Sequence, residues 1–456
     1  MNIAENLFKA YDIRGLVGAE LTVELAEAVG RALADFLPIK GPVCVGYDMR
    51  PDSAELAAAV RTGLARQGRT VYDIGQVASD MIYFAVGRLA AAGGAMVTAS
   101  HNPGAYNGIK LCAAEARPIG IETGLAVIRD AIAADDYKAA PTTPGQIEPR
   151  DIMEAWVNHA LSFAGAMPLR PYHIAVDAGN GMGGLVVPHL AKKWPLIVEP
   201  MYFELDGTFP NHPANPLEPA NNADLIAKVK ADSLDFGVAF DGDGDRAFLI
   251  DETGQIVSGS VTTAILAEHF LRLNPGATIL YNANCSRIVP ETIEAHGGKA
   301  IRTKVGHSYI KADMRTYDAV FAGEHSGHYY FRDNWCADSG LIAVICAIAA
   351  LSQSGQGLSA LANQYRKYAA SGELNFTVPD KAAAIARLKA AYADGQADEL
   401  DGLTVNYPDW WFIVRPSNTE PLLRLNVEAT TPALLEEHLH PLVELLQGLD
   451  PAHRSA

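Results

Sequence analysis

A short apolar strand runs directly into an acidic loop at Phe236-Gly-Val-Ala-Phe240 and Asp241-Gly-Asp243-Gly-Asp245-Arg246. We call residues 241–246 the acidic loop. Three carboxylates at alternating positions cannot pack into an apolar core, and their mutual repulsion is costly unless a cation lies among them. Carboxylate oxygens on a glycine-containing turn are typical ligands of Mg²⁺ or a similar divalent ion. The pattern therefore predicts a buried β-strand with a metal site at its end.

Two other structures could account for the acidic loop. An EF-hand would place aspartates at positions one, three and five and Glu252 at position twelve, but that motif needs glycine at position six, where Arg246 stands. It also needs flanking helices, whereas residues 236–240 and 247–250 are expected to be strands. The EF-hand is excluded on these grounds. A solvated acidic loop without function stays open for this segment taken alone.

The composition indicates a globular chain that is long enough for several domains. The 456 residues are 49% hydrophobic and 20% charged, and the net charge of −17 disfavours nucleic acid and anionic membranes as partners. The longest apolar run, Leu341 to Leu351, is too short to cross a bilayer. We expect no signal peptide, and five scattered cysteines without zinc or disulfide spacing favour the cytoplasm.

Three segments of the chain repeat one order of strands. First strands end in polar turns near Asp48, Asp177 and Asn282, and second strands are expected at 70–75, 198–205 and 299–304. Third strands lead into the serine loop (residues 98–103, Thr-Ala-Ser-His-Asn-Pro), the acidic loop, and the histidine loop (residues 323–328, Gly-Glu-His-Ser-Gly-His). Ligands bind beyond the carboxyl ends of parallel strands, so we expect the three loops to face one cleft.

The repeat predicts an α/β fold of three related α/β domains with mixed, mostly parallel sheets, plus a smaller C-terminal α+β domain, around one central cleft. The expected domains are residues 1–145 with the serine loop, 146–252 with the acidic loop, 253–368 with the histidine loop, and 369–456 with a phosphate-binding segment. A Pro/Thr-rich linker at 139–149 separates the first two domains. A hinge is expected near 369–373, so that the fourth domain can close over a ligand.

The residue types in these loops suit phosphoryl transfer. Ser100 offers a phosphate carrier, His101 and Lys110 offer proton transfer, and the acidic loop offers a cation that neutralises charge. Taken alone, Ser100 could simply cap a turn with His101 beside it, and Lys110 could be an ordinary surface lysine.

Two further segments suit a phosphorylated sugar. Glu324, Ser326 and His328 in the histidine loop supply donors and acceptors for sugar hydroxyls. The arginine segment (residues 415–421, Arg-Pro-Ser-Asn-Thr-Glu-Pro) pairs the fork of Arg415 with hydroxyl and amide groups that can complete a cradle for a phosphate dianion. A plain loop and an N-capped turn are the alternatives for these two segments.

With the four segments in this order and spacing, the chain resembles the α-D-phosphohexomutase superfamily. The resemblance covers the whole length, including residues 9–15 (Lys-Ala-Tyr-Asp-Ile-Arg-Gly). Among the branches of that superfamily, the chain is most similar to bacterial phosphomannomutase/phosphoglucomutase, partly through residues 328–333 (His-Tyr-Tyr-Phe-Arg-Asp).

The resemblance implies an enzyme that interconverts hexose 1-phosphate and hexose 6-phosphate, of glucose, mannose or both. Ser100 would carry the phosphoryl group, with Mg²⁺ as cofactor and a hexose 1,6-bisphosphate as intermediate and activator. The implied metal ligands are Ser100, Asp241, Asp243 and Asp245. The implied catalytic residues are Ser100, His101, Lys110, Arg246 and His328. The implied substrate-binding residues are Tyr11, Arg14, Lys304, Gly306, His307, Glu324, Ser326, Arg415, Ser417, Asn418 and Thr419.

One departure from the pattern leaves the preferred hexose open: His325 stands where the dual-specific branch commonly has Met. A phosphoglucosamine mutase is therefore an alternative. A phosphatase or phosphotransferase with an aspartyl nucleophile is another, because Asp241-x-Asp243 follows a strand, although Asp245 stands where that pattern expects Thr or Val. A third is a non-enzymatic metal- or sugar-phosphate-binding protein. The expected partners are small sugar phosphates, with no nucleic acid or membrane, and the expected state is a monomer or weak homodimer.

Overall fold

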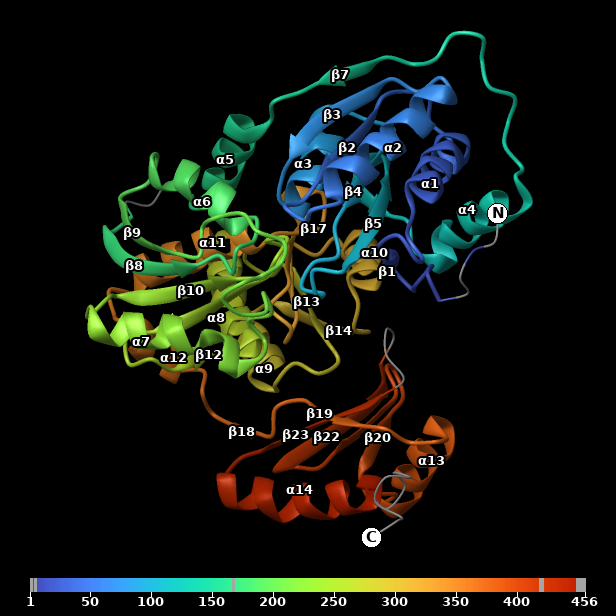
Figure 1. Cartoon of the computed structure of the whole chain (residues 1–456). Coiled ribbons are helices and arrows are strands. Elements are labelled where there is room, and N and C mark those ends of the chain that lie inside the picture. The colour runs from blue at the N-terminus through green and yellow to red at the C-terminus, as the bar shows by residue number, and fades with distance from the viewer. Residues whose placement is uncertain (1–2, 4–5, 166–168, 418–421, 448–456) are drawn as a thin grey trace.

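The structure, a computed structural model, describes residues 3, 6–165, 169–417 and 422–447, and the strands in these ranges form four sheets (Figure 1). The first sheet contains β1 (Ile13–Leu16), β2 (Val43–Tyr47), β3 (Val71–Gln76), β4 (Gly93–Val97), β5 (Tyr106–Ala113), β6 (Arg117–Pro118) and β7 (Ile147–Pro149). Its helices are α1 (Val23–Phe36), α2 (Ser53–Arg66), α3 (Ser79–Arg88) and α4 (Leu125–Ala134). Side chains of α1, α2 and α4 form a core with one face of the sheet.

The second and third sheets have five strands each. The second contains β8 (Tyr172–Asp177), β9 (Leu196–Met201), β10 (Phe236–Phe240), β11 (Ala247–Asp251) and β12 (Ile256–Val257), with helices α5 (Met153–Ser162), α6 (Gly183–Ala191) and α7 (Ala223–Ala231). The third contains β13 (Thr278–Asn282), β14 (Lys299–Thr303), β15 (Phe321–Gly323), β16 (Tyr329–Phe331) and β17 (Ala337–Asp338), with helices α8 (Gly259–Leu273), α9 (Ile288–Ala295), α10 (His307–Thr316), α11 (Gly340–Ser354) and α12 (Leu358–Asn363). Short 3₁₀ turns lie at Ala114–Ala116, Ile121–Thr123, Pro219–Asn222 and Arg332–Asn334.

The three sheets share one strand order, which explains the repeat in the sequence. In each repeat the first strand lies between the other two and pairs in parallel with both. The resulting strand orders are β4-β2-β3, β10-β8-β9 and β15-β13-β14. The following strand in each case (β5, β11 or β16) lies antiparallel to the third. The third strand is therefore central, and its loop emerges at the carboxyl edge of the sheet.

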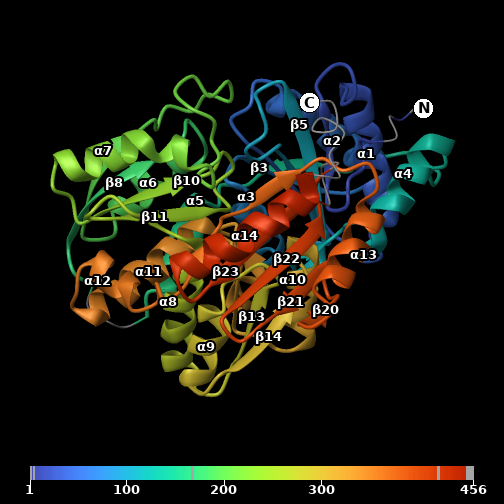
Figure 2. The ribbon, with the colours of Figure 1, turned by 90° about the horizontal axis from the view of Figure 1, so that it is seen from below.

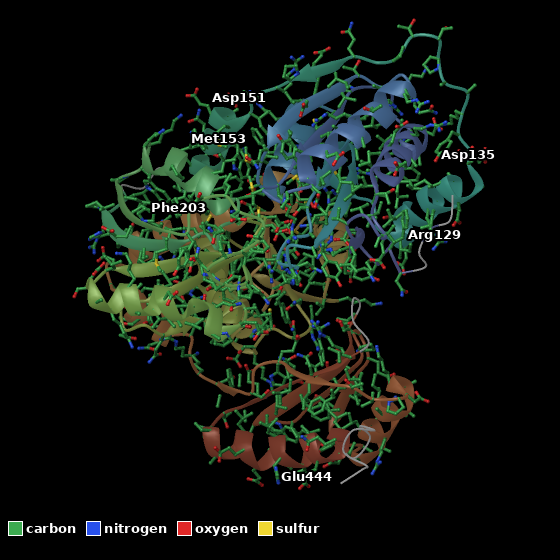
Figure 3. All side chains as sticks on the ribbon, in the orientation of Figure 1. Arg129, Asp135, Asp151, Met153, Phe203 and Glu444 are labelled. Atoms are coloured by element: carbon green, nitrogen blue, oxygen red, sulfur yellow. The ribbon has the colours of Figure 1, made fainter. Side chains whose placement is uncertain are left out.

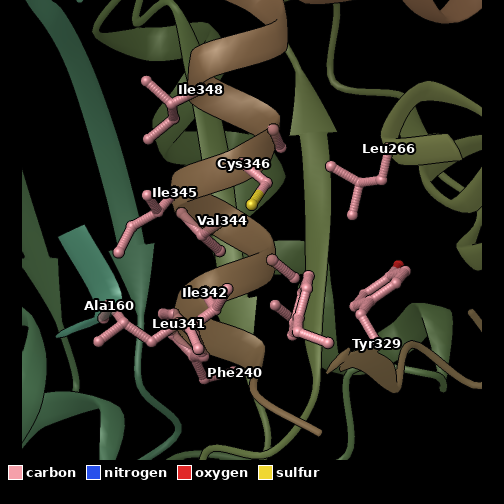
Figure 4. Close-up of a cluster of buried hydrophobic side chains, with 14 of the residues drawn as sticks. Ala160, Phe240, Leu266, Tyr329, Leu341, Ile342, Val344, Ile345, Cys346 and Ile348 are labelled. Atoms are coloured by element: carbon pink, nitrogen blue, oxygen red, sulfur yellow. The ribbon is translucent and has the colours of Figure 1, made fainter. Parts of the chain in front are cut away.

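Helix α11 packs at the centre of the first three domains. Its sequence is apolar on all sides, which is typical of a helix buried in a protein core. The helix begins after Ser339, whose Oγ accepts a hydrogen bond of 3.1 Å from the amide of Ile342. Figure 4 shows Leu341, Ile345 and Ile348 along this helix, with side chains of other elements around it. One core cluster connects residues of all three sheets, so these domains form one packed body.

The fourth sheet is antiparallel throughout and has a core of its own. It contains β18 (Ala369–Ala370), β19 (Leu374–Phe376), β20 (Gln396–Asp398), β21 (Leu403–Asn406), β22 (Trp410–Pro416) and β23 (Leu423–Ala429), with helices α13 (Lys381–Ala391) and α14 (Pro432–Gln447). Its core cluster contains residues from Phe376 to Leu446 and none from the other domains. Figures 1 and 2 show both helices on the side of this sheet that faces away from the rest of the molecule.

The fold class predicted from the sequence is confirmed, with two local differences. The end of the Pro/Thr-rich linker forms β7, which pairs with β3, so residues 147–149 belong to the first sheet. Arg415, expected just after its strand, lies within β22 opposite Arg424. In the described part of the chain no helix is both long and apolar enough to cross a membrane. Charged side chains such as Glu444 on α14 and Asp135 after α4 lie on the outside (Figure 3).

Candidate active site

The serine loop and the acidic loop come together from two different domains. Ser100 follows β4, is 6% exposed, and donates a hydrogen bond of 2.9 Å from Oγ to Oδ2 of Asp241 after β10. Its backbone has a positive φ of 52°, which is uncommon for a residue other than glycine, and its amide donates to Oγ1 of Thr98 at 2.9 Å. A Cβ on Gly242 would lie 2.5 Å from the carbonyl oxygen of Ser100, so the approach requires glycine at this position.

Lys110 connects β5 of the first domain with two carboxylates of the acidic loop. Its Nζ donates to Oδ2 of Asp243 at 2.8 Å and to Oδ2 of Asp245 at 2.7 Å. Burial acts to lower the pKa of Lys110, but these two carboxylates raise it well above its usual range, so the side chain stays charged. Burial acts to raise the pKa of Asp243, yet the charge and hydrogen bond of Lys110 and a bond from Ser79 Oγ at 2.5 Å keep that pKa below its usual range.

Arg246 neutralises the remaining carboxylate of the acidic loop. Its Nε donates to Oδ2 of Asp241 at 2.9 Å, and its amide donates to Oδ1 of the same group at 3.1 Å. Burial nevertheless raises the pKa of Asp241 to about 8, although Arg246 acts against it. A buried cluster with this much unfavourable charge would be stabilised by a further cation.

The acidic loop fits a divalent metal ion. One oxygen each of Asp241, Asp243 and Asp245 lies within 4.8 Å of the others, and all three residues are at most 2% exposed. Oδ1 of Asp243 and Oδ1 of Asp245 are buried without a hydrogen-bond partner. Unpaired buried carboxylate oxygens are costly, and hard oxygen donors of this kind suit a hard cation.

Two basic groups lie against the serine loop. Arg14 on β1 donates from Nη1 to Oδ1 of Asn102 at 2.9 Å and forms an ion pair with Asp12. The Nδ1 atom of His101 lies 3.1 Å from Ser100 Oγ. Burial, together with the charges of Arg246 and Arg14, holds the pKa of His101 well below its usual range, so the ring is neutral.

The histidine loop of the third domain adjoins the acidic loop. His328 and Arg246 form an antiparallel backbone bridge, and His328 Nε2 lies 3.6 Å from Asp245 Oδ1. The other ring nitrogen of His328 is 3.0 Å from Ser326 Oγ. Glu324 is 2% exposed and accepts hydrogen bonds from Asn282 Nδ2 at 2.9 Å and from the hydroxyl of Tyr330. Glu324, Ser326 and His328 are thus close together, as their proposed roles require.

A second group of predicted residues joins the first and third domains. The Tyr11 hydroxyl donates to the carbonyl of Val305 at 3.2 Å, and its ring contacts that of His307 with centroids 5.1 Å apart. Lys304 Nζ lies 5.7 Å from the centroid of the Tyr309 ring. Gly306 has a φ of 134°, and a Cβ there would lie 2.3 Å from the Tyr11 hydroxyl oxygen, so glycine is required.

The arginine segment belongs to the fourth domain, and the charge of Arg415 acts on His325 of the histidine loop. Arg415 is 4% exposed and donates from Nη2 to Oε2 of Glu373 at 3.0 Å, while Arg424 Nη1 lies 3.1 Å from Oε1 of the same carboxylate. Ser417 is 9% exposed, and its amide donates to the carbonyl of Leu422 at 2.8 Å. Asn418 and Thr419, which were also predicted to bind phosphate, lie outside the described residues.

His325 contacts helix α8. Its Nδ1 atom lies 3.0 Å from Ser260 Oγ, and that oxygen also accepts a hydrogen bond of 3.0 Å from the amide of Ser286. Burial lowers the pKa of His325, and the charges of Glu373 and Arg415 act on it with opposite signs. The ring lines a cavity of about 180 Å³ between the third and fourth domains, together with Asn284, Trp411 and Asn426.

Sequence reasoning missed several residues that contact the predicted ones. They are Ser79 beside Asp243, Asn282 and Tyr330 beside Glu324, and Glu373 beside Arg415. Ser79 follows a second strand and Asn282 ends a first strand, so both lie at the carboxyl edge where the loops gather. Their place in the repeat was a usable signal. Glu373 had no such signal, because it lies outside the repeat and was expected only as part of the hinge at 369–373.

The same division of the chain emerges from comparison with known proteins. Family models described as phosphoglucomutase/phosphomannomutase match four consecutive parts: α/β/α domain I at residues 5–139, domain II at 154–254, domain III at 258–368, and the C-terminal domain at 373–445.

Individual relatives match over almost the whole length. A Xanthomonas campestris protein named "Phosphohexose mutases" is 43% identical over 445 residues, covering 97% of this chain and 99% of that protein. A Pseudomonas aeruginosa protein named phosphomannomutase/phosphoglucomutase is 37% identical over 439 residues, covering 94% and 93%. A crystal structure of a phosphoglucomutase/phosphomannomutase family protein from Burkholderia thailandensis has a TM-score of 0.90 at 33% identity and covers 99% of each chain. These matches confirm the resemblance, and the chain belongs to the phosphoglucomutase/phosphomannomutase family.

Proposed function

We propose that the protein moves a phosphoryl group between the C1 and C6 oxygens of a hexose phosphate, of glucose and mannose, with Ser100 as the carrier. The observation that carries this proposal is the 2.9 Å hydrogen bond between Ser100 Oγ and Asp241, because it places a hydroxyl nucleophile against a buried acidic cluster from another domain. The names of the Xanthomonas and Pseudomonas relatives support the same reaction.

The reaction consists of two transfers. In the first, the bond between Ser100 Oγ and phosphorus breaks and a bond forms from phosphorus to O6 of hexose 1-phosphate, while the proton of that hydroxyl passes to a base and Ser100 Oγ takes up a proton. In the second, the bond from phosphorus to O1 of the hexose 1,6-bisphosphate breaks and a bond to Ser100 Oγ forms, while the Oγ proton passes to a base and O1 takes up a proton. The sum is hexose 6-phosphate and regenerated phosphoserine.

The side chains around Ser100 position the groups and balance charge, which are the main demands of phosphoryl transfer. Neutral His101, 3.1 Å from Ser100 Oγ, is placed to exchange a proton with it. Charged Lys110 neutralises two carboxylates, so we assign it to charge compensation more than to base catalysis. His328, between Ser326 and Asp245, is the third candidate for proton transfer, while Arg14 and Arg246 supply positive charge.

Asp241, Asp243 and Asp245, with the oxygen of a phosphorylated Ser100, are the residues that would hold Mg²⁺. When bound, the ion would supply positive charge to the transferring phosphoryl group. Two observations support Mg²⁺ at this site: the Oδ1 atoms of Asp243 and Asp245 have no hydrogen-bond partner among the described residues, and the three aspartates offer carboxylate oxygens, which Mg²⁺ prefers.

The remaining predicted residues would bind the far end of the substrate. We assign the non-reacting phosphate to Arg415 and Ser417, with Asn418 and Thr419 beside them in the sequence. Glu324 and Ser326 would bind sugar hydroxyls, and Tyr11, Lys304, Gly306 and His307 would line the cleft. Both ends of the bisphosphate must fit this site in turn, since the intermediate reorients between the two transfers.

The division into domains at 1–145, 146–252, 253–368 and 369–456 is part of the same proposal, with the exception that β7, at residues 147–149, pairs with the first sheet. We also propose a cytoplasmic enzyme, which the five free, buried cysteines support. It would act on small sugar phosphates as a monomer or weak homodimer.

A coupled assay with glucose 1-phosphate and mannose 1-phosphate, in Mg²⁺ and a trace of glucose 1,6-bisphosphate, tests the proposal. We expect comparable kcat/KM for both sugars, a phosphoryl group on Ser100 by mass spectrometry, and a loss of roughly 10³-fold or more in kcat for Ser100→Ala. An S100A enzyme that retains turnover would favour an aspartyl nucleophile. Turnover of glucosamine 6-phosphate alone would identify a phosphoglucosamine mutase, and binding without turnover would indicate a non-enzymatic protein.

A further inference from the structure

The side chain of Arg50 binds the backbone of the serine loop and of the residues that directly follow it. It lies in the turn between β2 and α2 and is 3% exposed. Its guanidinium donates hydrogen bonds to four carbonyl oxygens, all of which belong to residues 100–106. The bonds run from Nη1 to Pro103 (3.0 Å) and Tyr106 (2.8 Å), and from Nη2 to Ser100 (2.9 Å) and Asn102 (2.5 Å).

The serine loop needs such support for two reasons. Ser100 has a left-handed backbone, which a residue with a Cβ adopts at a cost that its surroundings must offset. Four carbonyl oxygens also converge on one buried guanidinium, in one buried and three partly buried hydrogen bonds, and acceptors shielded from water must be satisfied. A planar guanidinium with donors fixed in a fork satisfies all four at once, which an ammonium cannot do with the same geometry.

Arg50 is itself held in place from two domains. Asp48, fully buried, accepts from the Arg50 amide at 3.0 Å and from Ser53 Oγ at 2.5 Å, and its other oxygen lies 3.4 Å from Arg50 Nε. The Phe209 ring of the second domain lies 5.2 Å from the guanidinium carbon. The position of Ser100 therefore depends on contacts within the first domain and on contacts from the second domain, which also carries Asp241.

The third domain also supports its loop from the end of a first strand, although through a side chain of the loop and not its backbone. Asn282 ends the first strand of that repeat, as Asp48 follows the first strand of its repeat, and donates to Glu324 in the loop after the third strand. The end of the first strand thus supports the loop of the central strand in both repeats.

We propose that Arg50 is a positioning residue for the phosphoryl transfer: it fixes the backbone of the serine loop so that Ser100 Oγ keeps one place as a phosphate dianion is gained and lost there. The proposal rests on the proposed function, since it concerns the same serine. Arg50 acts through the loop backbone, so its loss lowers the rate of transfer more than the affinity for substrate. A displacement of about 1 Å at a reacting atom can cost about 100-fold in rate.

Arg69 provides a matched control in the same domain. Its guanidinium also donates to backbone carbonyls, those of Ala34, Leu37 and Ile39, at 2.6–3.1 Å, and all of them lie at the end of α1 or just beyond it. Arg69→Lys therefore removes a guanidinium that binds several backbone carbonyls, as Arg50→Lys does. The carbonyls bound by Arg69, however, lie outside the serine loop.

The experiment compares R50K, R69K and the unaltered full-length protein in kcat, KM, Tm, the rate of Ser100 phosphorylation by glucose 1,6-bisphosphate, and hydrogen exchange of residues 100–106. For R50K we expect a fall of about 100-fold in kcat, KM within about twofold, slower phosphorylation and faster exchange in that segment. For R69K we expect kcat within about twofold and unchanged exchange there. Equal kcat in R50K and R69K, or a loss in R50K that only follows its Tm, would overturn the proposal.

Phe209→Leu keeps the test usable if R50K does not fold, because it leaves the guanidinium in place and removes the ring beside it. We expect about a threefold fall in kcat and faster exchange of residues 100–106. Unchanged values for both would refute the positioning role. If the unaltered protein neither turns over hexose phosphates nor carries phosphate on Ser100, the proposed function fails instead, while hydrogen exchange still reports whether Arg50 holds the loop.

Discussion

At the scale of single residues, the site is a balance of buried charges. Three carboxylates of the acidic loop face Lys110 and Arg246, and each cation comes within 3 Å of its partners. Removing one partner of a buried pair leaves the other uncompensated, which costs more than the pair itself contributes. Substitutions in this cluster should therefore affect stability and metal binding together.

His325 is the residue whose role in sugar choice was open, and its contacts support an indirect one. Its ring nitrogen bonds to Ser260 on α8, away from the acceptors on Glu324. We expect His325→Met to change the ratio of kcat/KM for glucose 1-phosphate and mannose 1-phosphate by less than about threefold, since no hydrogen bond to the sugar is lost. The coupled assay with both sugars measures it, with Ser260→Ala as the control. A change of tenfold or more would mean that His325 distinguishes the two hexoses at C2.

At the scale of elements, the repeat explains why distant loops meet. Each central strand (β4, β10 or β15) delivers its loop to the carboxyl edge of its sheet, and turns from neighbouring strands support it. The loop between β9 and α7 belongs to this system, because Phe209 lies beside Arg50 and His212 binds Asp177 at the end of β8 through Nε2 at 2.9 Å.

The pair of His212 and Asp177 should make stability depend on pH. The hydrogen bond to Asp177 raises the pKa of His212 above its usual value, although burial acts against it. A raised pKa in the folded state means that the contribution is complete below the unfolded pKa of about 6.5 and is lost as pH rises through the higher folded pKa. We expect the Tm advantage of the unaltered protein over His212→Gln to be about 1–2 °C larger at pH 6 than at pH 9. Thermal unfolding of both proteins at the two pH values measures it, and a pH-independent difference would contradict this account.

At the scale of the whole molecule, the first three domains form one body and the fourth is a separate unit. The fourth domain has its own core. It contacts the third through polar groups such as Arg287, which donates to the carbonyls of Tyr407 and Trp410, and through a small apolar cluster of Ala283, Val305, Trp411 and Ile413. Arg415, assigned to the far phosphate, pairs with Glu373, which lies between β18 and β19 at the start of this domain. A separate core is typical of domains that move relative to one another.

Closure of the fourth domain should follow ligand binding. With glucose 1,6-bisphosphate we expect the radius of gyration to fall by about 0.5 Å, from about 22 Å for a compact chain of this length. Small-angle X-ray scattering with and without the ligand measures it. Arg415→Gln, which loses the fork for the far phosphate, should show no change and serves as the control. Identical profiles for the unaltered protein in both states would contradict the hinge.

Local patterns in the sequence were sufficient for the fold class, the repeat and the place of the four segments in the chain. Strand periodicity and turn residues act over a few neighbours, so Phe236–Phe240 and the acidic loop could be recognised where they stand. Contacts across long separations needed the folded chain. Lys110 meets Asp243 across 133 positions, and Arg50 meets Asn102 across 52. Neither pairing has a local signature, because a side chain's charge partner and pKa depend on which strands the sheet brings together and how much water the packing excludes.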